Sequence, residues 1–206
     1  MSADLLFALT VFAFVASITP GPNNMMLLAS GVNFGFRRTV PHMAGITVGF
    51  MVMMVLVGLG IGQVLEANQT AFLTLKIAGC IYMVWLAWKI ARGGPISADT
   101  GNGTTKPLTF MQAALFQWVN PKGWAMVLTA TAAYTDPANF ATTLAALAIV
   151  FGAVCIPSVG TWTLFGVGLR KLLQDPVKVR IFNILMAALL LVSMLPAMAD
   201  FFVARG

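Results

Sequence analysis

The sequence predicts an all-α polytopic membrane protein: six transmembrane helices arranged as two inverted three-helix repeats, with broken first and fourth helices. Three observations support this fold class. Hydrophobic residues make up 59% of the 206 residues and charged residues only 9%, whereas a soluble domain carries about 25% charged residues. Six apolar stretches follow one another along the chain. Two of these stretches contain proline-centred interruptions at matching depths, and such a pair is the sequence pattern of a transporter's binding site.

Each apolar stretch is long enough to cross a bilayer, which takes about 20 helical residues. The chain is predicted to form a single membrane domain over residues 1–206. Repeat 1 covers about residues 1–92, the Gly-, Ser-, Thr- and Pro-rich linker covers 93–107, and repeat 2 covers about 108–206. Three helices per repeat give the two repeats opposite orientations. The six stretches are Leu5–Val32, Val40–Val64, Ala71–Ala91, Leu108–Tyr134, Phe140–Leu164 and Ile181–Val203.

Local composition distinguishes the stretches. Glycines in the second stretch favour close helix packing, either within one chain or between two copies, so a homo-oligomer is an open alternative. The third stretch ends in Tyr82, Trp85 and Trp88, which is typical of a membrane interface. Cys80 and Cys155 lie far apart in apolar stretches. We expect both to be small packing residues, with neither a disulfide nor a metal site.

The two interruptions are the most informative motifs. The first stretch contains Thr19-Pro20-Gly21-Pro22-Asn23-Asn24, and the fourth contains Asn120-Pro121-Lys122-Gly123. Proline removes a backbone donor and clashes with the preceding turn. In lipid, each freed backbone group costs several kcal/mol unless protein, ions or water satisfy it. Both breaks are therefore predicted to face one polar cavity.

A broken helix offers binding groups of both signs. The half-helix after the first break exposes the backbone N–H groups of Asn23, Asn24 and Met25 to a carboxylate. The carbonyl groups near Thr19 carry the opposite partial charge and suit an ammonium group. A zwitterionic amino acid is therefore the predicted ligand. The candidate substrate-binding residues are Thr19, Pro20, Gly21, Pro22, Asn23, Asn24, Asn120, Pro121 and Lys122.

Lys122 is the only charged residue deep inside a predicted span, where burial of a charge costs at least about 2.5–3.5 kcal/mol. Three roles are open for it: binding a substrate carboxylate, neutralising carbonyl groups at the break, or reaching a water-filled vestibule. His42, the single histidine, starts the second stretch. It is either a packing group or, like Lys122, a residue for coupling or gating.

Several function classes are disfavoured. The six acidic residues lie in predicted loops or near the ends of spans, so no metal site is predicted and no cofactor is expected. An intramembrane enzyme would need a nucleophile with a base, or metal ligands, and the lone histidine lacks such partners. The net charge of +6 does not indicate nucleic-acid binding, because the basic residues lie in short connections between apolar stretches.

The same basic residues predict the orientation of the chain. They concentrate at the first, third and fifth connections, whereas the second and fourth carry Glu66 and Asp136. The positive-inside rule then places the odd-numbered connections in the cytoplasm and both termini outside. The basic residues concerned are Arg37, Arg38, Lys89, Arg92, Lys106, Arg170, Lys171, Lys178 and Arg180.

A set of motifs covers nearly the whole chain: Pro20-Gly21-Pro22-Asn23-Asn24, Gly35-Phe36-Arg37, Ala44-Gly45, Gly49, Gly79 with Tyr82, and Asn120-Pro121-Lys122. Together they resemble the LysE/RhtB family of amino-acid exporters. The stretch from Tyr82 to Ile90 most resembles the cysteine/O-acetylserine exporter branch. This resemblance implies a multi-pass bacterial inner-membrane protein that exports amino acids or small derivatives and is driven by the proton gradient.

The chain departs from the family pattern early in the second stretch. Ile46, Thr47 and Val48 stand where some members carry acidic residues. The resemblance therefore leaves the coupling mechanism open and disfavours a dibasic substrate, so small neutral amino acids are the preferred class.

The leading hypothesis is a secondary transporter that exports small amino acids from the cytoplasm by alternating access, with the lipid bilayer and the amino acid as its partners. A passive membrane channel is one alternative, but it would need a continuous polar stripe, and the spans carry few polar groups outside the breaks. A membrane assembly factor without a substrate is another alternative. It would leave the paired breaks without a purpose.

Overall fold

The computed structural model describes residues 1–62, 67–92, 106–170, 172–173 and 175–193, apart from the side chains of residues 69, 71, 72 and 76. Most of the predicted linker and the end of the sixth apolar stretch lie outside these residues. Every regular element within them is a helix, which confirms the all-α prediction. The elements are α1 (Ala3–Ile18), α2 (Pro22–Phe34), α3 (Phe36–Leu56), the π-helical turn η1 (Val57–Ile61), α5 (Gln69–Ala91), α6 (Phe110–Phe116), the 3₁₀ turn η2 (Gln117–Val119), α7 (Pro121–Tyr134), the 3₁₀ turn η3 (Pro137–Asn139), α8 (Phe140–Arg170) and α9 (Pro176–Val192).

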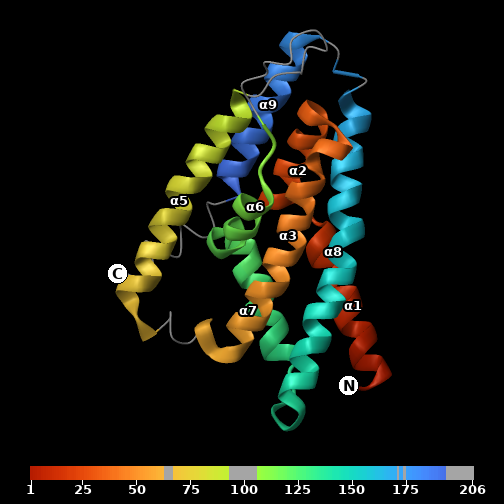
Figure 1. Ribbon diagram of the computed structural model, residues 1–206, viewed down its shortest axis with the longest axis vertical. Helices are drawn as coiled ribbons and strands as arrows, with labels where there is room; N and C mark the ends of the chain where they lie inside the picture. The colour runs from red at the N-terminus through yellow and green to blue at the C-terminus, as the bar shows by residue number, and fades with distance from the viewer. Residues whose placement is uncertain (63–66, 93–105, 171, 174, 194–206) are drawn as a thin grey trace.

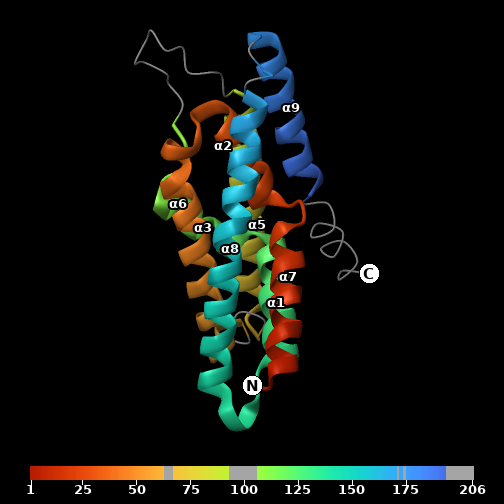
Figure 2. The ribbon, with the colours of Figure 1, turned by 90° about the vertical axis from the view of Figure 1, so that its right-hand side faces the viewer.

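The helices form an elongated bundle (Figures 1 and 2). The long helices α3 and α8 run along the bundle axis, and α8 packs against α1, α2 and α3. The pair α1 and α2 covers the same length in two pieces, with α1 in the half that contains the N-terminus. Helix α5 packs mainly against α9, and α6 packs against α3. Many large apolar side chains on the outside are exposed, including Phe7, Ile81 and Phe165, as expected where lipid is the solvent.

Three helical segments are long and apolar enough to cross a membrane: Phe36–Ile61, Leu73–Ala91 and Pro137–Arg170. The pair Ala3–Ile18 and Pro22–Phe34 qualifies as a fourth only if the two helices count together, and they meet at a bend of 54°. The predicted break in the first stretch is therefore confirmed.

The fourth stretch is broken as predicted, but it is not among these candidate spans. Thr109 accepts a hydrogen bond from the backbone N–H of Gln112, and the Gln112 side chain accepts one from Thr109. This capping box starts α6, which ends after seven residues and passes through η2 into the 14-residue α7. The Gln112 side chain therefore caps its own helix.

Helix α9 has 17 residues within the described part of the chain, slightly short of a full crossing. The described residues thus hold three continuous candidate spans and one bent pair, where the sequence predicts six helices. The fourth stretch does not count as a continuous span because the capping box, the 3₁₀ turn and the break divide it. The sixth stretch extends past the described residues, so the prediction of six helices stays a prediction.

Close helix contacts depend on glycine at a few positions. A Cβ atom on Gly45 would overlap the carbonyl group of Phe110, and one on Gly49 would overlap Ala114, so both glycines let α6 pack against α3. Gly31 and Gly166 meet in the same way between α2 and α8. Gly45 and Gly49 of the second stretch therefore serve packing within one chain.

We expect Gly45→Ala to destabilise the protein by about 1–3 kcal/mol, because the added methyl group must displace the α6 backbone. Gly160→Ala on α8 is the matched control, since nothing lies within 4 Å of its would-be Cβ atom. Thermal unfolding in detergent compares the two variants. An equal midpoint for both would show that α6 does not pack closely on α3.

Candidate functional site

Both breaks are built as helix starts. Gly21 is the extended N-cap of α2 and gives it no side-chain hydrogen bond, and Pro22 is its first residue. Asn120 is the N-cap of α7, with Pro121 as the first residue, and its side chain accepts a hydrogen bond from the Lys122 N–H at 3.2 Å. Proline fits the first position of a helix because its missing N–H would be unpaired there.

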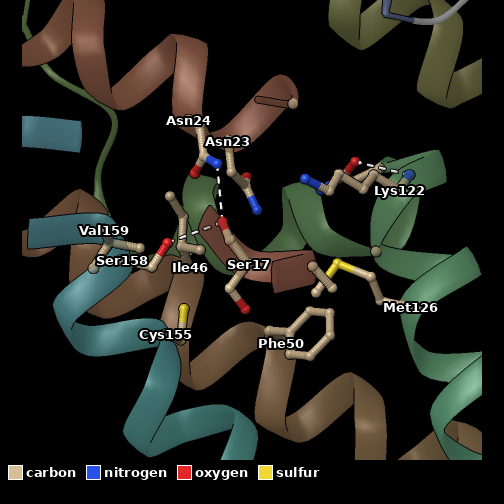
Figure 3. Close-up of a pocket in the computed structure, with 14 residues that line it drawn as sticks. Ser17, Asn23, Asn24, Ile46, Phe50, Lys122, Met126, Cys155, Ser158 and Val159 are labelled. Atoms are coloured by element: carbon tan, nitrogen blue, oxygen red, sulfur yellow. Dashed lines mark hydrogen bonds between the residues drawn. The ribbon is translucent and has the colours of Figure 1, made fainter. Parts of the chain in front are cut away.

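The side chain of Asn24 forms hydrogen bonds across the first break. Its Nδ2 atom donates to the carbonyl oxygens of Ser17 at 2.9 Å and Thr19 at 2.7 Å. The Ser158 hydroxyl of α8 also donates to the Ser17 carbonyl oxygen at 2.9 Å. Figure 3 shows Ser17 between these two partners. The last carbonyl groups of α1, which have no intrahelical partner, are therefore held by side chains.

Two further donors come from more distant elements. The Trp162 indole N–H of α8 donates to the Ile18 carbonyl oxygen at 3.0 Å. The Lys122 ammonium group donates to the carbonyl oxygens of Thr19 at 2.6 Å and Pro20 at 3.4 Å, and to the Thr19 hydroxyl at 3.1 Å. In this conformation Lys122 thus occupies the carbonyl cluster that the sequence assigns to a substrate ammonium group.

A second connection joins the breaks. Asn23 Nδ2 donates to Gln117 Oε1 at 2.9 Å, and Gln117 Nε2 donates back to Asn23 Oδ1 at 3.2 Å. Gln117 is fully buried and also donates to the Ala113 carbonyl oxygen at 2.9 Å. Gln117 therefore links α2 to the segment that leads into α7.

A cavity with an empty volume of about 460 Å³, part of it open to solvent, lies between the two breaks (Figure 3). Its described lining combines amides, hydroxyl groups, a thiol and one ammonium group with apolar side chains, and contains no carboxylate. The lining residues include Ser17, Gly21, Asn23, Asn24, Ile46, Phe50, Asn120, Lys122, Met126, Cys155 and Ser158.

The predicted site residues divide into two groups. Those that line the cavity are Gly21, Asn23, Asn24, Asn120 and Lys122; those that belong to the breaks without lining it are Thr19, Pro20, Pro22 and Pro121. One detail differs from the sequence prediction. The Met25 N–H is not free, because it donates to the Gly21 carbonyl oxygen at 3.0 Å. His42, the other candidate for coupling or gating, lines a separate cavity.

Sequence reasoning missed several residues of the lining. Ser17 directly precedes the first break, so its position was a usable signal. Cys155 and Ser158 flank Pro157 in α8, where polar residues beside a proline mark a weakened helix. The Thr47 hydroxyl donates to the Cys155 sulfur at 3.5 Å. Ile46, Phe50 and Met126 carried no signal, because only the tertiary fold brings α3 and α7 to the break.

The arrangement suits a small dipolar solute. Uncapped N–H groups at the start of α2 and the Lys122 ammonium group can bind a carboxylate. Hydroxyl and amide oxygens can accept from an ammonium group, and Phe50 and Met126 can contact an apolar side chain.

Comparison with known proteins places this chain in a family. The LysE type translocator model matches residues 14–195. A cysteine/O-acetylserine efflux protein of Escherichia coli O1:K1 / APEC is 34% identical over 198 residues, covering 92% of this chain and 95% of the relative. The efflux proteins of the same name from Escherichia coli K12 and Shigella sonnei are each 33% identical over 198 residues, with the same coverage. No solved structure matches the chain.

The chain therefore belongs to the LysE type translocator family. Its members are membrane transporters, so the protein is a translocator and not an enzyme, as the sequence predicts. The motifs that carry the resemblance, including both breaks, lie within the matched residues.

We expect Asn24→Ala to cost about 1–3 kcal/mol of stability, because two part-buried hydrogen bonds to the carbonyl groups of Ser17 and Thr19 are lost. Asn24→Asp should cost more, since a carboxylate would face the carbonyl oxygens of Ser17 and Thr19. Asn139→Ala removes an exposed amide that bonds only near a turn and should shift stability by less than about 0.5 kcal/mol. Thermal midpoints in detergent rank the variants. A milder effect for Asn24→Asp than for Asn24→Ala would contradict this role.

Proposed function

We propose that the protein is a secondary transporter that exports small neutral amino acids or their derivatives from the cytoplasm by alternating access. The observation that carries the proposal is the cavity shared by the two breaks, with groups for both ends of a zwitterion around it. The names of the similar proteins suggest cysteine and O-acetylserine as the first substrates to examine.

Recognition is proposed to work by an exchange of partners at Lys122. In the present conformation its ammonium group binds the carbonyl oxygens of Thr19 and Pro20. A bound amino acid would pair its carboxylate with Lys122 and with the N–H groups of Asn23 and Asn24. Its own ammonium group would then take over the vacated carbonyl oxygens. The net charge at the break does not change, because a zwitterion carries none, and this limits the cost of binding in a weakly polar surrounding.

Alternating access is proposed to depend on the two connections between the breaks. The Lys122 contacts and the Asn23–Gln117 pair hold α1 and α2 to the segment from α6 to α7. Both connections must separate when one repeat rocks against the other. This scheme keeps the predicted inverted repeats, about residues 1–92 and 108–206, as the moving bodies.

The proposal places the protein in the bacterial inner membrane, with the first, third and fifth connections in the cytoplasm and both termini outside. In Figure 1 the connections from α2 to α3 and from α8 to α9 lie at one end of the bundle, opposite the N-terminus. Arg37, Arg38 and Arg170 accompany these connections. Export is proposed to draw on the proton gradient, with Lys122 and His42 as the candidate coupling residues.

We expect Lys122→Ala to lower export of O-acetylserine from proteoliposomes by about 10- to 100-fold, the range expected for lost hydrogen bonds to a charged group. Lys178→Ala is the matched control, because Lys178 is exposed at the start of α9. An unchanged thermal midpoint would show that Lys122→Ala is folded. Wild-type export by a folded Lys122→Ala variant would remove Lys122 from the site.

Counterflow separates the carrier from the two alternatives. A carrier loaded with unlabelled O-acetylserine should accumulate external labelled O-acetylserine transiently, because the outward-moving substrate returns binding sites to the outside. A passive channel would only equilibrate the label, and an assembly factor would not move it. Either of these two results would refute alternating access.

Substrate protection tests the location of the site. With Cys80 replaced by Ala, Cys155 is the only cysteine, and it lines the cavity. O-acetylserine at 10 times its Kd should slow modification of Cys155 by a small maleimide about tenfold, since about one site in ten stays empty. In the converse Cys155→Ala variant, Cys80 on α5 should react at an unchanged rate. Equal behaviour of the two cysteines would place the substrate elsewhere.

A further inference from the structure

A second cavity lies beside the other end of α2, opposite the break. It has an empty volume of about 450 Å³, part of it open to solvent. The cavity is lined by the last turns of α2, the first turns of α3, the end of α5 and the approach to α6. Its polar and charged lining residues are Ser30, Asn33, His42, Lys89 and Lys106.

His42 is the unusual member of this lining. Its side chain is 99% buried, and neither ring nitrogen has a hydrogen-bond partner among the described residues. An imidazole ring left without partners costs free energy, because burial removes its hydrogen bonds to water. Such a group in a lined cavity needs an explanation, and a ligand that binds it provides one.

The other buried polar groups of the cavity are already paired. The hydroxyl groups of Ser30 and Thr39 bond to each other at 2.8 Å. Asn33 donates to the Ala29 carbonyl oxygen at 2.8 Å and to Asn183 Oδ1 at 2.8 Å. Among the buried polar groups of the described lining, the imidazole of His42 is therefore the one that is free to bind a ligand.

The charges of the cavity are of one sign. Lys89 and Lys106 contribute two ammonium groups, and no carboxylate is among the described lining residues. The Lys89 ammonium lies 5.2 Å from the centre of the Trp85 ring, a weak contact on the outer part of the helix. A ligand with a negative charge would gain from both lysines and would accept a hydrogen bond from the imidazole N–H.

We propose that this cavity is a second binding site, separate from the break, that takes a small carboxylate, and that its ligand in the cell is the α-carboxylate of the amino acid before export. His42 supplies the hydrogen bond, while Lys89 and Lys106 supply the charge. The order in which a substrate would visit the two sites rests on the proposed function. Binding of a carboxylate in this cavity is independent of the proposed function, because it follows from the residues of the cavity alone.

The position of the cavity fits a site at which substrate is first held. Its lining reaches from Phe34 at the end of α2 to Met26, and Met26 lies one turn from Asn23 at the break. Under the proposed orientation, the end of α2 at Phe34 is the cytoplasmic one. The amino acid would thus meet the second cavity before the cavity between the breaks.

The single histidine of the chain provides a direct measurement. Protein labelled with ¹⁵N-histidine, purified through a tag without histidine and placed in nanodiscs, should give signals from one imidazole ring only. Titration with O-acetyl-L-serine should shift these signals in a saturable way. The methyl ester of O-acetyl-L-serine, which lacks the carboxylate, and sodium chloride at equal ionic strength should leave them unshifted.

Two variants identify the partners. Lys89→Gln should raise the Kd from this titration about tenfold, the lower limit for losing a hydrogen bond to a charged group. Lys178→Gln is the matched control and should leave the Kd unchanged, because Lys178 is exposed on α9 and does not line the cavity. Acetate should also shift the signals, at higher concentrations, since it carries the carboxylate alone.

Several outcomes would overturn the proposal: no shift with O-acetyl-L-serine or acetate, an equal shift with the ester, or an equal shift with chloride. Lys122→Ala separates this proposal from the proposed function. If O-acetyl-L-serine still shifts the His42 signals in Lys122→Ala while export is lost, the second site binds the carboxylate independently of the break. If wild-type protein shows the titration but no export, the proposed function fails and the carboxylate site remains.

Discussion

The structure depends on one constraint: the backbone groups freed by the first break need partners in apolar surroundings. The carbonyl oxygens of Ser17, Ile18, Thr19 and Pro20 all receive hydrogen bonds from side chains. These donors come from three elements, α2, α7 and α8. Satisfying a single break therefore draws distant parts of the chain together, and the space between them becomes the cavity. The same groups that hold the fold are those that a dipolar solute would use.

Helix α2 connects the two cavities. Its first turn faces the cavity between the breaks, and its last turns face the cavity around His42. Glycine contacts bring α2 close to α8 at Gly31 and Gly166, so this helix contact is expected to shift when the two repeats rock. Because α2 is a single helix, a displacement at one of its ends is expected to reach the other. The two proposed sites are thus mechanically related even though they share no lining residue.

Much of the fold could be predicted from the composition and from the positions of apolar residues and prolines along the chain. Hydropathy placed the helices, because the absence of charge over about 20 residues is a local property. The proline motifs placed both breaks, because proline removes a backbone donor wherever it stands. The point at which a helix begins inside an apolar stretch could not be predicted this way. A stretch such as Leu108–Tyr134 is apolar enough to cross, yet the bonding of Thr109 and Gln112 decides where its first helix begins.

The sequence by itself determined the class of protein, the helical fold and the position of both breaks, because these follow from residues adjacent in the chain. Tertiary structure alone decided which groups are free to bind. It paired Lys122 with the carbonyl group of Thr19, it brought Cys155 and Phe50 to the cavity, and it left His42 buried without a partner among the described residues. Whether a buried polar group has a hydrogen-bond partner depends on the residues that the fold brings next to it. The spacing of residues in the sequence therefore could not predict which groups stay free.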